Sequence, residues 1–139
     1  MAHERILIVE DEYITGEVIR QMVQEFGYEP MGPVTSGKDA VTSALTHYPD
    51  VVLMDIVLKG PMTGIQAAEA IRSHSRCSVI YVTGNSDRFS IELSKTAEPF
   101  GYILKPINVQ GLHAAIEKAL NRPGPVKSSG AWPPSTREL

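Results

Sequence analysis

The chain has 139 residues, of which 42% are hydrophobic and 21% are charged, and its net charge is −3. This length and balance predict one soluble domain with a proper core, and the weak negative charge disfavours a surface for nucleic acid or membrane. The single cysteine, Cys77, excludes an internal disulfide and a multi-cysteine zinc site. No apolar stretch approaches the roughly 18 residues of a membrane span, and the N-terminus lacks the form of a signal peptide. We therefore expect a cytoplasmic protein.

Apolar runs alternate with amphipathic segments in the first half of the chain. Arg5–Glu10 is an apolar run that predicts a first strand, and Tyr13–Phe26 carries apolar residues at helical spacing. Tyr28–Val34 is a weaker strand, and its two prolines favour a position at or near the edge of a sheet. A second helix is expected to open at Thr35–Lys38 and to close before Pro49.

The second half continues this alternation and completes the predicted fold. Asp50–Met54 is apolar after its first residue, which predicts a central strand buried on both faces. The further expected elements are a helix around Ile65–Ile71, a strand at Ser78–Val82, a helix from Ser86 or Asp87 to about Ala97, a strand at Phe100–Leu104 and a helix from Val109 to Leu120. Strands and helices at this pace predict an α/β fold, a doubly wound five-stranded parallel sheet in the order 2-1-3-4-5. Residues 1–121 are expected to form this domain, and the Pro-, Gly- and Ser-rich residues 122–139, which include Trp132, a tail or linker.

Polar side chains follow the carboxyl ends of four predicted strands. They are Glu10, Asp11 and Glu12 after the first strand, Asp55 after the third, Thr83 after the fourth and Lys105 after the fifth. In the predicted strand order these ends face one crevice. Clustered carboxylates suit Mg²⁺ (or Mn²⁺), and a carboxylate is a known nucleophile for phosphoryl groups, whose transfer needs positioning and charge neutralisation. The sequence therefore predicts phosphoryl acceptance at Asp55, with Lys105 and the Thr83 hydroxyl contacting the phosphoryl oxygens.

Each of these side chains also has an ordinary structural explanation. Taken alone, Glu10–Glu12 suits the first turn of a helix, where the helix dipole favours acids. Lys105 alone suits a solvated lysine, Thr83 a β-branched strand residue, and Asp55 a helix cap. Separate strands bring all of them to one edge of the sheet, however, and this convergence favours a functional site.

Four segments at these spacings resemble the receiver domains of two-component response regulators: Ile6–Glu12, Val51–Asp55, Tyr81–Gly84 and Tyr102–Pro106. The resemblance covers about residues 4–121. It implies the flavodoxin-like receiver fold and a signalling switch phosphorylated by a sensor histidine kinase or a histidine phosphotransfer protein. It also implies only slow self-phosphotransfer and autodephosphorylation, so we do not expect an enzyme in the ordinary sense.

The resemblance assigns the phosphorylation chemistry to particular residues. It implies that Asp55 is the phosphoacceptor and that Asp11 is the main metal-binding acid, with Glu10 as its partner. Asp55 itself and the backbone carbonyl of Val57 are the further implied metal ligands, and Lys105 is the implied phosphate-contacting lysine. Val57 also stands where the side chain influences phosphate lifetime in this family, and we expect its apolar side chain to slow hydrolysis.

The resemblance implies a switch as well. Thr83 and Tyr102 look like the switch pair: the Thr83 hydroxyl would move towards phosphate on Asp55, and Tyr102 would rotate into the vacated space. This would change the surface of the fourth helix, fifth strand and fifth helix, where an unknown downstream protein or a second copy in a homodimer would bind. The Lys105–Pro106 peptide bond is expected to be cis.

The loop after Asp55 departs from the common family pattern. It is one residue longer and matches a subgroup through Gly60–Ile65.

The sequence leaves functional alternatives open. The chain is either a stand-alone receiver or the receiver part of a hybrid histidine kinase or multi-domain regulator. The least favoured alternative is an Asp-nucleophile phosphatase, which needs a second Asp two residues after the nucleophile, where this chain has Val57.

Overall fold

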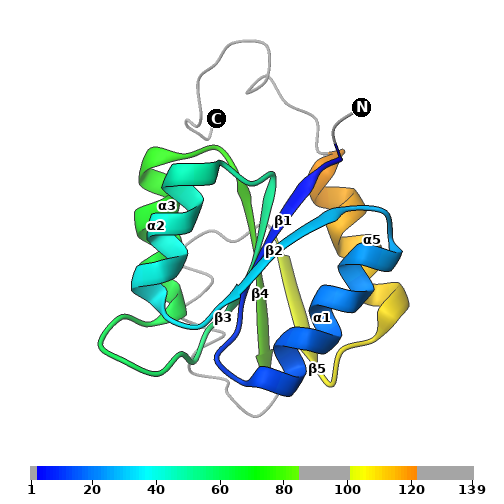
Figure 1. The fold of residues 1–139 in the computed structure, drawn as a ribbon, viewed down its shortest axis with the longest axis horizontal. Helices are drawn as coiled ribbons and strands as arrows, with labels where there is room; N and C mark the ends of the chain where they lie inside the picture. The colour runs from blue at the N-terminus through cyan, green and yellow to red at the C-terminus, as the bar shows by residue number, and fades with distance from the viewer. Residues whose placement is uncertain (1–2, 85–100, 122–139) are drawn as a thin grey trace.

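The computed structural model describes residues 3–84 and 101–121 and shows a sheet between two layers of helices (Figure 1). Five parallel strands pair in the order β2-β1-β3-β4-β5. The strands are β1 (Arg5–Val9), β2 (Glu29–Val34), β3 (Val51–Asp55), β4 (Ser78–Gly84) and β5 (Gly101–Lys105). The described helices are α1 (Tyr13–Glu25), α2 (Gly37–His47), α3 (Gly64–His74) and α5 (Val109–Leu120). The predicted doubly wound sheet and its strand order are confirmed, whereas the helix predicted near residues 86–97 lies outside the described residues.

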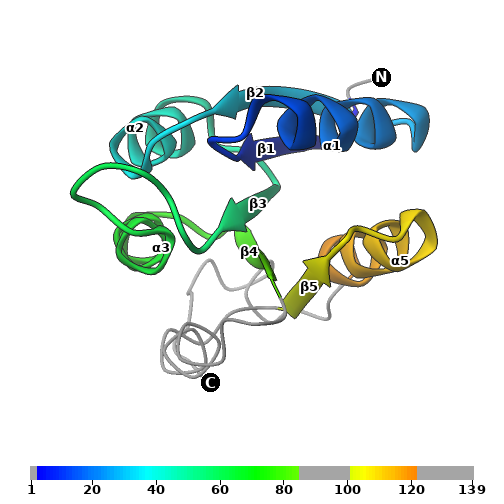
Figure 2. The same ribbon diagram turned by 90° about the horizontal axis from the view of Figure 1, so that it is seen from below.

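Alternate side chains of each inner strand enter two separate cores. Helices α2 and α3 cover one face of the sheet, and α1 and α5 cover the other (Figure 2). In β3, Val52 and Met54 pack towards α2 and α3, whereas Val51 and Leu53 pack towards α1 and α5. Because successive side chains of a strand point to opposite faces, an apolar run without polar interruptions is required here, and β3 is buried along its whole length.

The outer strands differ from the centre as the sequence predicted. Strand β2 lies at one edge of the sheet and is only partly buried. Its prolines, Pro30 and Pro33, lack the N–H that a neighbouring strand on the far side would need. Strand β5 forms the other described edge. In the part of the chain that the structure describes, no helix is long and apolar enough to cross a membrane.

The strands extend further than the apolar runs indicated. Asp55 pairs with Val82 across β3 and β4, and Thr83 and Gly84 pair with Leu104 and Lys105 across β4 and β5. The predicted site residues Asp55, Thr83 and Lys105 therefore lie within the last residues of their strands rather than just past them. Ladder pairing fixes their backbones, so their positions relative to one another are set by the sheet itself.

The loop from β3 to α3 is held at several points. The Gly64 N–H donates to the Ile56 carbonyl at 2.9 Å, and Leu58 is buried in the core under α2 and α3. Helix α3 then begins with a capping box in which Thr63 and Gln66 satisfy each other's backbone N–H groups at 2.9 and 3.1 Å. A side chain on this loop is thus presented from a well-anchored backbone.

Candidate functional site

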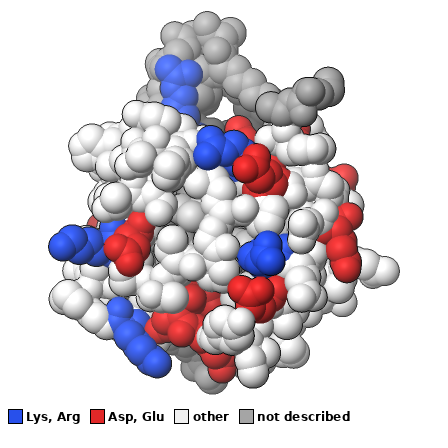
Figure 3. Space-filling model, in the orientation of Figure 1, with Lys and Arg blue, Asp and Glu red and all other residues white. Residues whose placement is uncertain are grey.

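A cleft opens at the edge of the sheet where the strands end. It is lined by residues from the ends of four strands and the loops that follow them: Glu10, Asp11, Glu12, Asp55, Val57, Lys59, Gly84 and Lys105. Figure 3 shows acidic side chains gathered along the lower part of this face, the same end at which the strands finish in Figure 1. All of the lining residues except Lys59 and Gly84 were assigned to the site from the sequence, so six of the predicted residues meet here.

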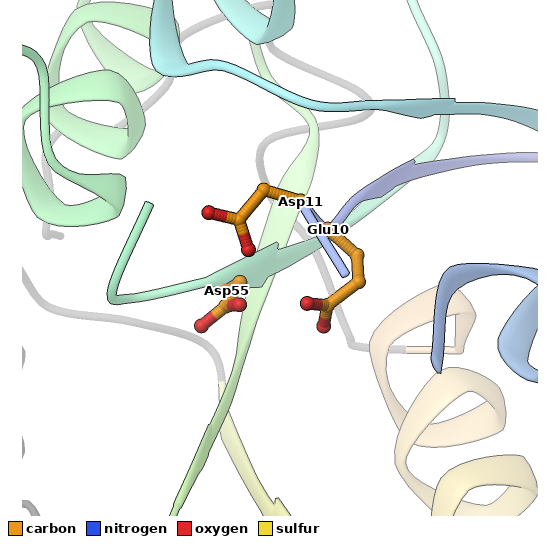
Figure 4. Close-up of side chains that lie close together, drawn as sticks. All are labelled: Glu10, Asp11 and Asp55. Carbon is orange, nitrogen blue, oxygen red and sulfur yellow. The ribbon is translucent and has the colours of Figure 1, made fainter. Parts of the chain in front are cut away.

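Three carboxylates form the centre of the cleft (Figure 4). Glu10, Asp11 and Asp55 each offer one oxygen, and these three oxygens lie within 4.8 Å of one another. Glu10 and Asp55 are only 2% and 5% exposed, whereas Asp11 is partly exposed. Carboxylates held this close repel one another unless a cation joins them, and oxygen donors of this kind fit a hard divalent cation such as Mg²⁺. The residues present therefore suit the metal that the sequence predicted.

Lys105 provides positive charge inside the cluster. Its ammonium lies 3.1 Å from Glu10 Oε1 and 3.5 Å from Asp55 Oδ2. Burial alone lowers the pKa of Lys105, but the Asp55 and Glu10 carboxylates raise it by more, and the pKa ends above its ordinary value. Lys105 thus stays charged at physiological pH and bridges the acids of β1 and β3.

The surroundings of Asp55 fix its carboxyl group and shift its pKa. Its Oδ1 accepts the Val57 N–H at 3.1 Å, which fixes the orientation of the carboxyl group. Burial, followed by the nearby Glu10 carboxylate, raises the pKa of Asp55 from 3.8 to about 7, although Lys105 and the Val57 N–H oppose the shift. A cation bound beside Asp55 would favour the ionised carboxylate, which is the form able to act as a nucleophile.

Backbone donors orient the other two acids. Glu10 Oε2 accepts the Glu12 N–H at 3.1 Å, and Asp11 Oδ2 accepts the Lys59 N–H at 2.9 Å. The second bond joins the end of β1 to the loop after β3. Sequence reasoning missed Lys59 as a cleft residue; the available signal was a basic residue in the loop that directly follows the strand of Asp55.

The predicted switch residues lie beside the cleft rather than in its lining. Thr83 is buried, and its hydroxyl makes only a long contact of 3.4 Å to the Gly84 carbonyl. The Tyr102 ring centroid lies 6.4 Å from that of Tyr81, and the buried Tyr102 hydroxyl has no hydrogen-bond partner among the described residues. At the end of β5, the peptide bond between Lys105 and its proline is cis.

The sequence profile of the response regulator receiver domain matches residues 6–117. The chain belongs to the response regulator receiver domain family. This membership agrees with the fold and the acidic cleft. It confirms the resemblance predicted from four sequence segments, each of which includes the carboxyl end of β1, β3, β4 or β5.

Two curated relatives show how this receiver domain compares with longer proteins. It is 36% identical over 118 residues to the transcriptional regulatory protein PdtaR of Mycobacterium tuberculosis, and the matched region covers 85% of this chain and 57% of PdtaR. It is 28% identical over 119 residues to the DNA-binding response regulator MtrA of Mycolicibacterium paratuberculosis, which covers 86% of this chain and 52% of MtrA. The chain therefore spans little more than half the length of these relatives.

A solved structure offers a comparison for the cleft. The receiver domain of the sensor histidine kinase PA1611 from Pseudomonas aeruginosa is 30% identical to this chain, with a TM-score of 0.79 over 86% of this chain and 98% of that domain. That structure carries a magnesium ion coordinated in its active site cleft. The acidic cleft of the present receiver domain has the oxygen donors for an ion of the same kind.

Proposed function

We propose that this receiver domain is a phosphorylation switch in which Asp55 accepts a phosphoryl group from a sensor histidine kinase or a histidine phosphotransfer protein, with Mg²⁺ (or Mn²⁺) in the cleft. The observation that carries the proposal is the setting of the Asp55 carboxylate. It is buried, it lies 3.5 Å from the Lys105 ammonium, and it shares an oxygen cluster with Glu10 and Asp11. These are the parts that phosphoryl transfer to an acid requires.

The Asp55 carboxylate is the nucleophile of the transfer step. Oδ1 is held by the Val57 N–H, and an oxygen of the same carboxylate attacks the phosphorus of the donor. The bond from phosphorus to the donor's nitrogen or oxygen breaks, and the electron pair leaves with that atom. Lys105 stabilises the negative charge on the phosphoryl oxygens. Asp11, Glu10, Asp55 and the backbone carbonyl of Val57 would hold the metal ion, which when bound supplies charge neutralisation.

Phosphorylation would then alter the neighbouring surface. Thr83 is the second-to-last residue of β4, the strand next to β3, and its weakly bonded hydroxyl is available to phosphate on Asp55. Tyr102, whose buried hydroxyl lacks a partner among the described residues, would rotate towards Thr83. We propose that the surface of the predicted fourth helix, β5 and α5 changes as a result, and that a downstream protein or a second copy of the chain binds there.

The cleft favours slow chemistry over turnover. Val57, two residues after Asp55, lines the cleft and is 60% exposed. An Asp-nucleophile phosphatase needs its second acid at this position, where this chain has an apolar side chain. We therefore propose self-phosphotransfer and slow autodephosphorylation only. The cytoplasmic location remains a prediction.

A second candidate is that the chain is the receiver part of a longer regulator. It covers 57% of PdtaR and 52% of MtrA, whose names describe transcriptional regulation and DNA binding. We propose that residues 1–121 are the receiver domain and that residues 122–139 are a linker to an output region of this kind. That the receiver domain itself does not contact nucleic acid stays a prediction from its charge.

Phosphorylation with a small donor tests the proposal. The protein is incubated with acetyl phosphate and Mg²⁺, and its intact mass is followed over time, with EDTA and an Asp55→Ala variant as controls. We expect one phosphoryl group on the wild type, none on Asp55→Ala and much slower addition in EDTA. Addition that survives Asp55→Ala, or no addition to the wild type, would overturn it.

A further inference from the structure

Two lysines line the acidic cleft, and they differ in what they bind. The Lys105 ammonium is engaged by Glu10 at 3.1 Å and by Asp55 at 3.5 Å. Lys59 also lines the cleft, but its side chain is exposed, and its ammonium forms no ion pair within residues 3–84 and 101–121. Unlike Lys105, Lys59 therefore forms no ion pair with a described carboxylate.

The backbone of Lys59 is fixed at the rim of the cleft. Its N–H donates to Asp11 Oδ2 at 2.9 Å, which ties the loop to the acid at the end of β1. The preceding residue, Leu58, is buried in the core, and the following residue, Gly60, has a φ of +98°, a backbone conformation that favours glycine. The bond to Asp11 and the burial of Leu58 hold the Lys59 backbone at the rim, while its exposed, flexible side chain can reach into the cleft.

A phosphodonor that enters the cleft adds negative charge, which a positively charged side chain has to balance. Among the described residues, four carboxylates line the cleft, from Glu10, Asp11, Glu12 and Asp55, against the two lysines. A divalent cation brings this set close to neutrality, and the phosphoryl group of a donor then adds up to two negative charges. Since Lys105 is bound by two acids, Lys59 is, among the described residues of the cleft, the cation available to meet the donor.

We propose that Lys59 is a donor-binding residue whose ammonium contacts the phosphoryl oxygens of the incoming phosphodonor and so sets donor affinity. The inference rests on the proposed function of Asp55 as the phosphoacceptor. The recognised chemistry is the phosphoryl anion itself, which is common to a small acyl phosphate and to phosphohistidine on a protein. Lys59 acts on binding, whereas Asp55 and Lys105 act on the transfer.

The test compares donor dependence in matched variants. Initial rates of phosphorylation are measured by intact mass at saturating Mg²⁺, over a range of acetyl phosphate or of phosphoramidate, whose P–N bond imitates phosphohistidine. The proteins are the wild type, Lys59→Gln, Lys59→Arg and Lys118→Gln, a control at an exposed lysine in the last turn of α5. Unchanged thermal unfolding shows that each variant is folded.

For Lys59→Gln we expect the KM for both donors to rise about threefold to tenfold, as for the loss of one exposed charge-assisted contact, with the maximal rate within about twofold of the wild type. Lys59→Arg should stay near the wild type, because it keeps the charge, and Lys118→Gln should be unchanged. Raising the ionic strength should reduce the difference between Lys59→Gln and the wild type.

Three results would overturn the inference: an unchanged KM in Lys59→Gln, an equal rise in Lys118→Gln, or a rise for only one of the two donors. The last would show contact with the leaving group instead of the phosphoryl group. A wild type that takes up no phosphoryl group at Asp55 would instead overturn the proposed function and the inference with it, so the two failures are distinguishable.

Discussion

Replacement of Asp55 by asparagine should stabilise the metal-free receiver domain at neutral and alkaline pH. Burial, with the Glu10 carboxylate adding to it, raises the pKa of Asp55 from 3.8 to about 7. The native state therefore binds this proton more tightly than the unfolded chain does. Between about pH 4 and pH 7 the unfolded state carries fewer protons, so the contribution of Asp55 to the free energy of unfolding falls as the pH rises.

The size of the effect follows from the same pKa. A shift of about three units at about 1.4 kcal/mol each makes the ionised Asp55 cost at most about 4 kcal/mol above pH 7. Asparagine removes this charge, and its oxygen can still accept the Val57 N–H. The 3.5 Å ion pair with Lys105 is already contained in this net shift, whereas solvent in the open cleft screens the Asp55 charge and reduces its cost. We expect Asp55→Asn to raise the free energy of unfolding by about 2 kcal/mol at pH 8.

Urea denaturation in EDTA at a series of pH values measures this difference. The advantage of Asp55→Asn over the wild type should be smallest near pH 4, grow up to about pH 7 and then level off. Asp39→Asn, at an exposed acid in the first turn of α2, is the control and should show no such growth. An advantage that is the same at pH 5 and pH 8, or an Asp55→Asn variant less stable than the wild type at pH 8, would refute the reasoning.

Three further substitutions test the loop after β3. Gly64→Ala should lower the free energy of unfolding by about 2 kcal/mol or more in urea denaturation, because a Cβ there would overlap the Asp55 carbonyl oxygen; Gly84→Ala, where a Cβ meets nothing within 4 Å, is the control. Thr63→Ala should cost about 1 kcal/mol in the same assay through loss of the α3 cap, and no loss would contradict the capping role. Val57→Asn should lose phosphate about threefold faster or more once the donor is removed, as followed by intact mass, if the apolar side chain excludes attacking water; an unchanged lifetime would argue against this.

Much of the fold was predictable because its signals lie in continuous stretches of sequence. An uninterrupted apolar run predicts a strand buried on both faces, and β3 is buried throughout. Prolines in Tyr28–Val34 predict an edge strand, and β2 lies at the edge. Once the strand order was predicted, the acids of β1 and β3 and the lysine of β5 had to converge, because parallel strands end at one edge of the sheet.

The features that sequence reasoning missed depend on contacts between distant residues. Lys59 reaches the rim of the cleft because its N–H bonds to Asp11, 48 residues away, and because Gly60 turns the loop with a positive φ. The spacing of apolar residues along the sequence does not indicate a hydrogen bond between residues so far apart. Likewise, the closer approach of Lys105 to Glu10 than to Asp55 is set by side-chain packing that residue types alone do not specify.

Borohydride trapping tests most directly the central claim that Asp55 carries the phosphoryl group. The protein is treated with acetyl phosphate and Mg²⁺ and then with sodium borohydride, which reduces an aspartyl phosphate to homoserine, and the digested peptides are sequenced by mass spectrometry. Our account predicts homoserine at position 55, dependent on both the donor and Mg²⁺. Homoserine at another acid of the cleft, or none at position 55 in protein that has gained phosphoryl mass, would contradict it.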